Sequence, residues 1–167
     1  MLKRFYPAER KSSVYVIDYE EMYQKGYRGI LFDIDNTLVP HDAPADERSI
    51  KLFKKLEEIG FSSCFISNND EERVRLFNEE IGNPYIFDAK KPSKEGYYQG
   101  MKVMGTKPSN TFAVGDQLFT DVWGAKKARI HCILVKPIHP KEKWTIVLKR
   151  VLERVVMFFY KRSKEEK

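Results

Sequence analysis

Two carboxylates stand two residues apart where an apolar run of the sequence gives way to a polar turn. The run ends in Asp33-Ile34-Asp35-Asn36-Thr37. Because strand side chains alternate with a period of two, Asp33 and Asp35 should leave an extended segment on the same side. Neighbouring acids repel unless a cation or a shared proton lies between them, and Mg²⁺, which prefers oxygen ligands and also binds phosphate, suits such a pair. Alone, the motif is equally consistent with ordinary turn and helix-capping residues after a strand.

Short apolar runs alternate with helical patterns along the chain. The predicted strands span residues 29–34, 62–67, 85–87, 111–115 and 132–135. The predicted helices span residues 47–59, 69–81 and 94–104, with a shorter helix after residue 121. Glycine follows each of the three longer helices, as is common at helix ends. This order predicts an α/β fold with a five-stranded, mainly parallel sheet and helices on both of its faces.

Polar residues follow four of the predicted strands, and ligands of such sheets bind at the carboxyl ends of the strands. After the two acids described above come Ser67, Asn68 and Asn69, then Lys90, Lys91 and Pro92, and then Asp116 and Asp121. One edge of the sheet would therefore carry acids for a metal ion, a hydroxyl with backbone amides for phosphate, and an ammonium group for phosphoryl charge.

Four segments resemble the motifs of the haloacid dehalogenase (HAD) superfamily, in the order of that superfamily. They are Asp33-x-Asp35-x-Thr37, Ser67, Lys91-Pro92 and Gly115-Asp116-x-x-x-x-Asp121. The stretch from Asp33 to Leu38 and the Gly-Asp-Gln-Leu-x-Thr-Asp form of the last motif resemble class IIIA, and within it the YqeG-type phosphatases. These are similar to phosphatidylglycerophosphate phosphatases. The resemblance implies the three-layer, Rossmann-like HAD fold.

The resemblance also implies a phosphomonoesterase that works through an aspartyl phosphate. Asp33 would be the nucleophile, Asp35 the general acid and then the general base, and Lys91 the cation that stabilises the transferring phosphoryl group. Mg²⁺ would be held by the Asp33 side chain, the Asp35 backbone carbonyl and the Asp116 carboxylate. Phosphate would be bound by Thr37, Ser67, Asn68 and Lys91. Asp121 would have a supporting role: it binds a metal-bound water, positions Lys91, or caps the following helix.

No cap domain is expected in the HAD fold of this chain. Predicted helices already occupy most of the sequence between Thr37 and Ser67 and between Ser67 and Lys91. The length of 167 residues fits one domain over residues 1–167. An open site suits a substrate whose bulk stays outside, such as a lipid headgroup, a phosphoprotein or a nucleic-acid end.

Charge and hydropathy indicate an anionic partner. Thirty basic and 24 acidic residues leave a net charge of +6. Apolar residues recur at helical spacing over residues 143–160, which predicts an amphipathic helix that either packs on the sheet or lies on anionic lipid. No nucleic-acid partner is expected, because the aromatic residues of this helix lie in its apolar face and form no stacking platform.

The cysteines and the N-terminus favour the cytoplasm. Cys64 and Cys132 lie inside apolar runs and are expected to be reduced core residues. The segment from Met1 to Arg10 lacks the apolar stretch of a signal peptide. We therefore expect a cytoplasmic protein, with peripheral attachment to the inner face of the membrane left open. His41, in the loop after Asp33, is expected to be a solvated histidine.

The favoured function is a Mg²⁺-dependent phosphatase of phosphatidylglycerophosphate or a similar membrane phosphate. One alternative is a phosphatase of a phosphoprotein or a soluble phosphorylated metabolite. Another is a noncatalytic adaptor that binds a membrane or a ribonucleoprotein, although the complete set of acids and the lysine speak against it. The sequence leaves the physiological substrate and the oligomeric state open.

Overall fold

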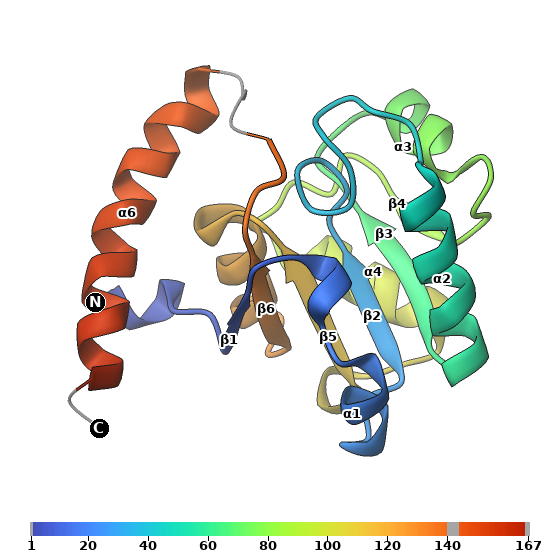
Figure 1. Cartoon of the computed structure of the whole chain (residues 1–167), viewed down its shortest axis with the longest axis horizontal. Coiled ribbons are helices and arrows are strands. Elements are labelled where there is room, and N and C mark those ends of the chain that lie inside the picture. Colours follow the sequence, from blue (N-terminus) through green and yellow to red (C-terminus); the bar gives the residue numbers. More distant parts are fainter. Residues whose placement is uncertain (1, 140–143, 166–167) are drawn as a thin grey trace.

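A six-stranded parallel sheet forms the centre of the computed structural model (Figure 1). The structure describes residues 2–139 and 144–165, without the side chains of residues 144–148 and 165. The sheet order is β1-β6-β5-β2-β3-β4. The strands are β1 (Glu9–Lys11), β2 (Gly29–Phe32), β3 (Ser62–Ile66), β4 (Tyr85–Ile86), β5 (Thr111–Gly115) and β6 (His131–Val135).

Helices connect the strands and cover both faces of the sheet (Figure 1). The α-helices are α1 (Tyr19–Gln24), α2 (Glu47–Ile59), α3 (Glu71–Asn78), α4 (Glu95–Met104), α5 (Trp123–Lys127) and α6 (Trp144–Glu165). Shorter helical turns are η1 (Leu2–Phe5), η2 (Val14–Val16), η3 (Pro108–Asn110) and η4 (Leu118–Val122), the last of them a π-helix. The arrangement confirms the predicted three-layer α/β fold.

Successive side chains of the central strands point to opposite faces of the sheet. They therefore pack into two separate apolar layers. On one face, Ile30 and Phe32 of β2 pack in a cluster that includes Phe53 of α2. On the other face, Leu31 of β2 packs in a cluster that includes Tyr97 of α4. All four residues of β2 are buried. The central strand is therefore covered on both sides, and the polar residues that follow it begin at a buried strand end.

The structure corrects the predicted strand count from five to six. The additional strand, β1, pairs in parallel with β6 at the edge of the sheet, with Glu9 opposite Ile133. Its sequence, Glu-Arg-Lys, carries no apolar residue, so a search for apolar runs passes over it. Charged residues are common on edge strands because one side of the ladder faces water.

Helix ends follow local capping chemistry. The helix predicted over residues 69–81 is shorter, Glu71–Asn78, because the Asp70 carboxylate accepts a hydrogen bond from the Arg73 amide and starts the helix there. Gly60 ends α2 with a φ of 108°, in the left-handed region that glycine adopts readily. Among the described residues, the segments after β2 and β3 lead directly into α2 and α3 and contain no cap domain.

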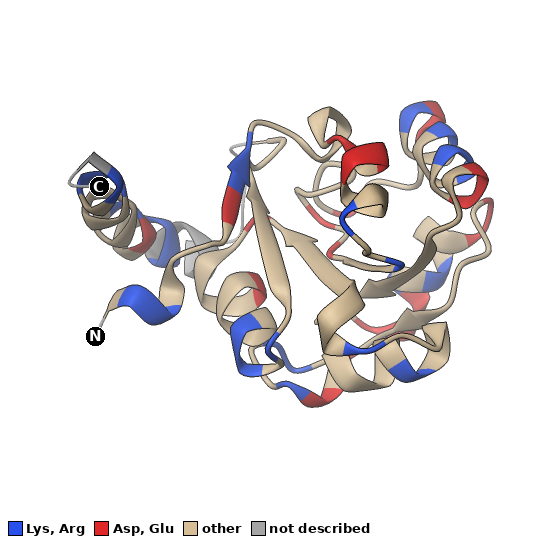
Figure 2. Cartoon of the chain, turned by 90° about the horizontal axis from the view of Figure 1, so that it is seen from below, with Lys and Arg blue, Asp and Glu red and all other residues tan. Residues whose placement is uncertain are grey.

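Helix α6 lies along one side of the molecule, beside η1 (Figures 1 and 2). Val156 of α6 is buried, and the ring of Tyr160 lies 5.2 Å from that of Tyr6. The helix reaches Glu165 rather than ending at residue 160, while residue 143 and the side chains of Trp144, Val147 and Leu148, which contributed to its prediction, lie outside the described part of the chain.

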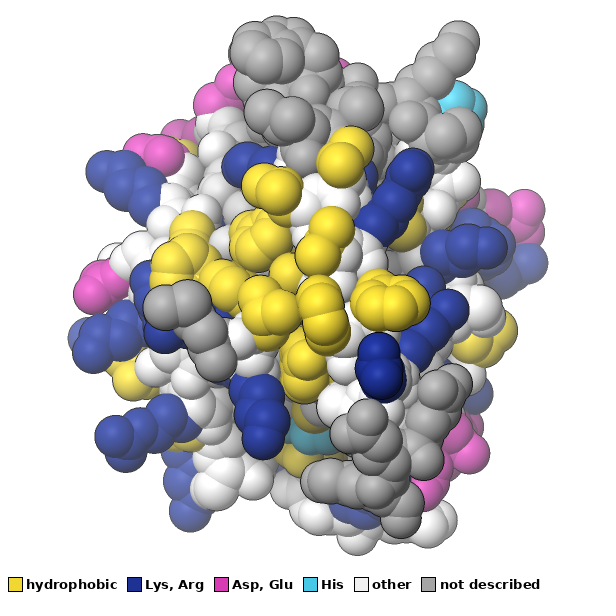
Figure 3. All heavy atoms as spheres, turned by 90° about the vertical axis from the view of Figure 1, so that its left-hand side faces the viewer, with side chains coloured by type: hydrophobic (Ala, Val, Ile, Leu, Met, Phe, Trp, Pro, Cys, Tyr) yellow, Lys and Arg dark blue, Asp and Glu magenta, His cyan; other side chains and the backbone are white. Residues whose placement is uncertain are grey.

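Large apolar side chains of α6 remain exposed. They are Val151, Leu152, Val155, Phe158 and Phe159. Figure 3 views this side of the molecule, where hydrophobic side chains gather in one patch and Lys and Arg side chains lie around it. None of the described helices combines the length and the apolar content that crossing a bilayer requires.

Candidate active site

The carboxyl ends of β2 and β5 meet at the point where the sheet order reverses. From β2 the chain adds β3 and β4 on one side and then β5 and β6 on the other. Open α/β sheets bind ligands at such a reversal. The Asp33 amide donates to the Val114 carbonyl at 2.9 Å and so continues the pairing of these two strands. Asn36 then takes a φ of 62°, and the chain turns away.

Lys91 connects two of the predicted site acids. Its Nζ lies 2.6 Å from Asp33 Oδ1 and 2.7 Å from Asp121 Oδ1. All three side chains are almost completely buried. Of the roles left open for Asp121, this contact matches the positioning of Lys91. Asp121 does not cap α5, because it lies inside η4 and its Oδ2 accepts the Gln117 amide at 3.1 Å.

The backbone of Lys91 is held by Asn68. The Lys91 amide donates to Asn68 Oδ1 at 2.6 Å, and Asn68 Nδ2 donates to the Lys91 carbonyl at 3.1 Å. The Asn68 side chain thus positions the lysine. The predicted contact of Asn68 with phosphate is through its backbone amide, which these two hydrogen bonds do not involve.

Thr37 bridges the two acids of β2 and β5. Its hydroxyl lies 3.0 Å from Asp33 Oδ2 and 3.3 Å from Asp116 Oδ1. One carboxylate oxygen from each of Asp33, Asp116 and Asp121 lies within 4.8 Å of the other two. Clustered carboxylate oxygens are the donors that a hard divalent cation prefers. Asp35, His41 and Asp42 form a second group of similarly close atoms, but the three carboxylates are more deeply buried and are the stronger candidate metal centre among the described residues.

The electrostatics of this cluster fit a cation. Burial raises the pKa of Asp33 to about 6, although the Lys91 ammonium opposes that change. Burial also raises the pKa of Asp116 well above its usual range, with the charge of Asp33 adding to the effect. Burial alone would lower the pKa of Lys91, but Asp121 and Asp33 outweigh it and raise that pKa. A divalent ion would offset the carboxylate charge that these shifts reveal.

Asp35 belongs to a second group of contacts. Its Oδ2 accepts Asn69 Nδ2 at 2.6 Å, and its Oδ1 accepts Arg73 Nη2 at 2.9 Å and the Asp42 amide at 2.8 Å. His41 Nδ1 lies 3.7 Å from Asp35 Oδ1. The Asp35 carboxylate therefore contacts α3 and the loop after β2, whereas the Asp33 carboxylate contacts Lys91.

One hollow of about 170 Å³ connects the two groups. Asp33, Asp35, Ser67 and Lys91 all line it. Ser67 accepts a hydrogen bond from the Asn69 amide at 3.1 Å and does not cap α3, since Asp70 does so. The hollow brings together the two acids of the first motif, the hydroxyl and the ammonium group that were predicted from separate strand ends, whereas Asp116 and Asp121 do not line it.

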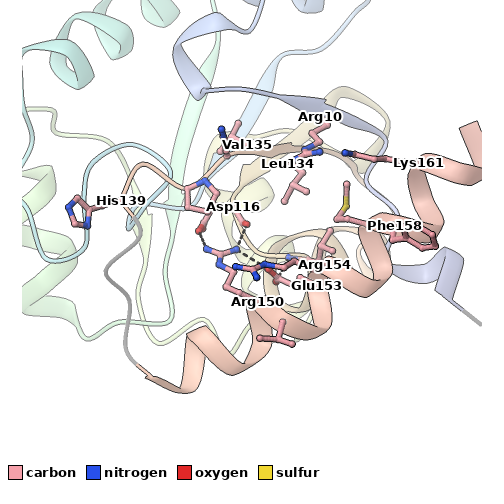
Figure 4. Close-up of a pocket in the computed structure, with 15 residues that line it drawn as sticks. Arg10, Asp116, Leu134, Val135, His139, Arg150, Glu153, Arg154, Phe158 and Lys161 are labelled. Atoms are coloured by element: carbon pink, nitrogen blue, oxygen red, sulfur yellow. Dashed lines mark hydrogen bonds and ion pairs between the residues drawn. The ribbon is translucent and has the colours of Figure 1, made fainter.

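Helix α6 supplies two residues that the sequence did not single out. Arg150 forms an ion pair with Asp116, its Nη1 donates to the Asp116 carbonyl at 2.6 Å, and it lies 3.0 Å from Glu153 Oε2 (Figure 4). Glu153 Oε1 accepts the Leu118 amide at 2.8 Å. A cation three residues before an acid on a helix is an ordinary surface pair, so no sequence signal distinguished them.

Arg73 was also missed. Its side chain is 9% exposed, and besides Asp35 it lies 3.9 Å from Asp42. Its Nε and Nη1 atoms are buried and have no hydrogen-bond partner among the described residues. The one available signal was its place in the first turn of the helix that follows Ser67, which faces the same edge of the sheet.

Comparison with known proteins identifies the family of the chain. The HAD-hydrolase-like family matches residues 89–137. The chain is 36% identical over 165 residues to the probable phosphatase YqeG of Bacillus subtilis, covering 98% of this chain and 96% of that protein. It is 26% identical over 156 residues to phosphatidylglycerophosphate phosphatase 1, chloroplastic/mitochondrial, of Arabidopsis thaliana, covering 87% of this chain but only 44% of that protein.

Solved structures share the fold at low sequence identity. A HAD-superfamily hydrolase from Ehrlichia chaffeensis matches with a TM-score of 0.52 and 16% identity, over 65% of this chain and 86% of that one. The cobalt-bound deoxy-D-mannose-octulosonate 8-phosphate phosphatase of Haemophilus influenzae matches with a TM-score of 0.53 and 19% identity, over 66% of this chain and 69% of that one. At these identities the likeness concerns the fold alone.

Proposed function

Because the chain belongs to the YqeG-type phosphatases of the HAD superfamily, we propose that it is a Mg²⁺-dependent phosphomonoesterase that forms an aspartyl phosphate on Asp33. The observation that carries the proposal is the approach of Lys91 Nζ to Asp33 Oδ1, at 2.6 Å, inside the hollow that Asp35 and Ser67 also line. A buried ammonium group beside a carboxylate keeps that carboxylate ionised, and an ionised carboxylate can attack phosphorus.

The first chemical step forms the bond between an Asp33 oxygen and phosphorus while the bond from phosphorus to the alcohol oxygen breaks. Asp35 gives its proton to the departing alcohol. In the second step Asp35 takes a proton from water, the water oxygen attacks phosphorus, and inorganic phosphate leaves Asp33. Lys91, which lines the hollow, and the backbone amides near Ser67 would offset the charge of the phosphoryl oxygens.

The hydrogen bonds of Asp35 favour its role as a base over its role as an acid. Its carboxylate oxygens accept hydrogen bonds from Asn69 and Arg73, and the contact with Arg73 would loosen when Asp35 carries the proton that it donates to the leaving group.

Mg²⁺ would be held by the Asp33 side chain, the Asp35 backbone carbonyl and Asp116, as the family resemblance implies. The clustered oxygens of Asp33, Asp116 and Asp121 and the raised pKa of Asp33 and Asp116 fit such an ion. When bound, it would neutralise charge on the nucleophile and on the substrate phosphate.

We further propose phosphatidylglycerophosphate or a similar membrane phosphate as the substrate, with the protein at the inner face of the membrane. The absence of a cap among the described residues leaves the hollow open to a substrate whose bulk stays outside. The similarity to the plant enzyme and the basic, apolar side of the molecule support the same choice.

A substrate panel tests the proposal. The panel contains phosphatidylglycerophosphate in mixed micelles, a phosphopeptide and a sugar phosphate, each assayed with Mg²⁺ and with a chelator. The matched variants are Asp33→Asn and Asp88→Asn, because Asp88 is an exposed acid paired with Lys90. We expect Mg²⁺-dependent release of phosphate from the lipid, its loss in Asp33→Asn and its retention in Asp88→Asn. Preferred hydrolysis of the phosphopeptide or the sugar phosphate would refute the proposed substrate.

A further inference from the structure

A second, larger hollow lies between α6 and the edge of the sheet. Its volume is about 710 Å³, within the range of about 300–1,000 Å³ that is typical of small-molecule sites. Strand β6 contributes Leu134 and Val135 to it, and α6 contributes Val151, Met157 and Phe158. We refer to this hollow as the α6 cavity. It is separate from the hollow lined by Asp33 and Lys91, although Asp116 and Arg150 of the candidate active site also line it.

The rim of the α6 cavity carries an excess of positive charge. Its basic residues other than Arg150 are Arg10, Lys136, Arg154 and Lys161. The two acids of the lining, Asp116 and Glu153, are both engaged by Arg150. No ion pair joins the other four cations to an acid among the described residues.

Two of these cations meet across the cavity. Arg10 comes from β1 and Lys161 from α6, and Figure 4 shows the ends of their side chains pointing toward each other. Like charges that converge without an acid between them repel. An anion bound between them would remove the repulsion and join the two elements.

The shape and the charge together point to an amphiphile. A free phosphate ion would pair with the cations but would make no favourable contact with the apolar residues that line the cavity. A second copy of the chain is disfavoured, because a two-fold contact over this side would bring the same Lys and Arg side chains together. The exposed apolar face formed by Leu152, Val155 and Phe159 lies on the same helix and would face hydrocarbon if the molecule rested on a bilayer.

We propose that the α6 cavity binds one anionic phospholipid, with an acyl chain against Leu134, Met157 and Phe158 and the headgroup phosphate between Arg10 and Lys161. This binding site lies outside the catalytic hollow. The inference goes beyond the proposed function and holds whichever phosphoester Asp33 attacks.

The test measures direct binding of a lipid that carries no phosphomonoester. The full-length protein is titrated by calorimetry with dihexanoyl phosphatidylglycerol as dispersed monomers, and in parallel with dihexanoyl phosphatidylcholine. We expect phosphatidylglycerol to bind, and the Kd of phosphatidylcholine to be at least about tenfold higher. A tenfold difference in Kd corresponds to about 1.4 kcal/mol. Absence of binding, or equal binding of the two lipids, would overturn the proposal.

A matched pair of variants separates the α6 cavity from the outer face of the helix. Val151 and Val155 are both 51% exposed on α6, but only Val151 lines the cavity. Val151→Glu should weaken phosphatidylglycerol binding about tenfold, whereas Val155→Glu should leave it within about twofold. Equal losses in the two variants would assign the lipid to the outer face and refute the cavity as its site.

A second variant keeps the test decisive if Val151→Glu fails to fold. The double variant Arg10→Gln/Lys161→Gln should lose the preference for phosphatidylglycerol over phosphatidylcholine while it still hydrolyses p-nitrophenyl phosphate at the wild-type rate. A retained preference would contradict the assignment of the headgroup. Binding of a polyglutamate peptide as tight as that of the lipid would also contradict it, and would indicate an acidic protein partner.

Discussion

Replacement of Arg150 by methionine tests how α6 is coupled to the candidate metal centre. Arg150 pairs with Asp116, whose side chain has no exposed surface, and with Glu153, which is 8% exposed. Arg150→Met preserves much of the apolar length of the side chain but leaves both buried acids without their cation. Breaking a buried ion pair in this way costs about 3–5 kcal/mol.

This loss of stability can be measured as a decrease in the melting temperature. For a chain of this size, 1 kcal/mol corresponds to about 2–4 °C, so Arg150→Met should melt about 6–20 °C below the wild type when a chelator is present. The matched control is Arg154→Met, because Arg154 lies on the same helix and forms no ion pair with a described acid. The control should melt within about 2 °C of the wild type, as exposed substitutions usually do.

Mg²⁺ should then bind the Arg150→Met variant more tightly than it binds the wild type. Arg150 and a metal ion both stabilise the charge of Asp116, so removal of the guanidinium leaves a more negative carboxylate for the ion. We expect the Kd of Mg²⁺, measured by calorimetry, to fall about tenfold, which is about 1.4 kcal/mol. The reasoning would be refuted if Arg150→Met melted like Arg154→Met and bound Mg²⁺ no more tightly than the wild type.

Three further substitutions probe the catalytic hollow. Gly115→Ala would place a Cβ 2.4 Å from Asp121 Cγ; we expect a loss of about 1–3 kcal/mol in urea unfolding, as for other overpacked sites, together with reduced turnover. The pKa of Asp33 is displaced from 3.8 to about 6, so the folded state binds the extra proton; without metal, stability should fall by on the order of 3 kcal/mol as the pH rises from about 4 to about 6. Asp33→Asn should reduce that dependence, which pH-dependent melting would reveal; the raised pKa of Asp116 contributes a dependence of the same sign that remains. Lys91→Met should lower kcat at saturating substrate by about 100-fold or more, and an unchanged kcat would rule out its contact with the phosphoryl group.

The sequence predicted the fold well wherever burial dictates composition. β2 and β5 are covered on both faces, so their runs of mostly apolar residues are enough to identify them as strands. The edge strand β1 follows a different rule, since three charged residues can pair with β6 while their side chains reach water. Its pairing is set by tertiary structure alone, and a local pattern does not reveal it.

The site residues likewise divide into those that local sequence patterns predicted and those that only the tertiary structure reveals. Asp33, Lys91 and Asp116 could be identified because each follows a strand, and the geometry of a parallel sheet brings strand ends together. Arg73 and Arg150 could not, because each reaches the site from a helix rather than from a strand end, and a helical arginine most often faces water. The different surroundings of Asp33 and Asp35 could not be predicted either, because the Arg73 side chain and the Asp42 amide that bind Asp35 come from segments whose approach no local pattern reveals.

The most direct test of the account is to locate the covalent phosphoryl group. The protein would be mixed with phosphatidylglycerophosphate and Mg²⁺, quenched in acid within the first turnovers, treated with borohydride and digested for mass spectrometry. Borohydride reduces an aspartyl phosphate to homoserine, so homoserine is expected at position 33 and nowhere else. Homoserine or a stable phosphoryl group at another residue, or hydrolysis that proceeds with Asp33 never modified, would contradict it.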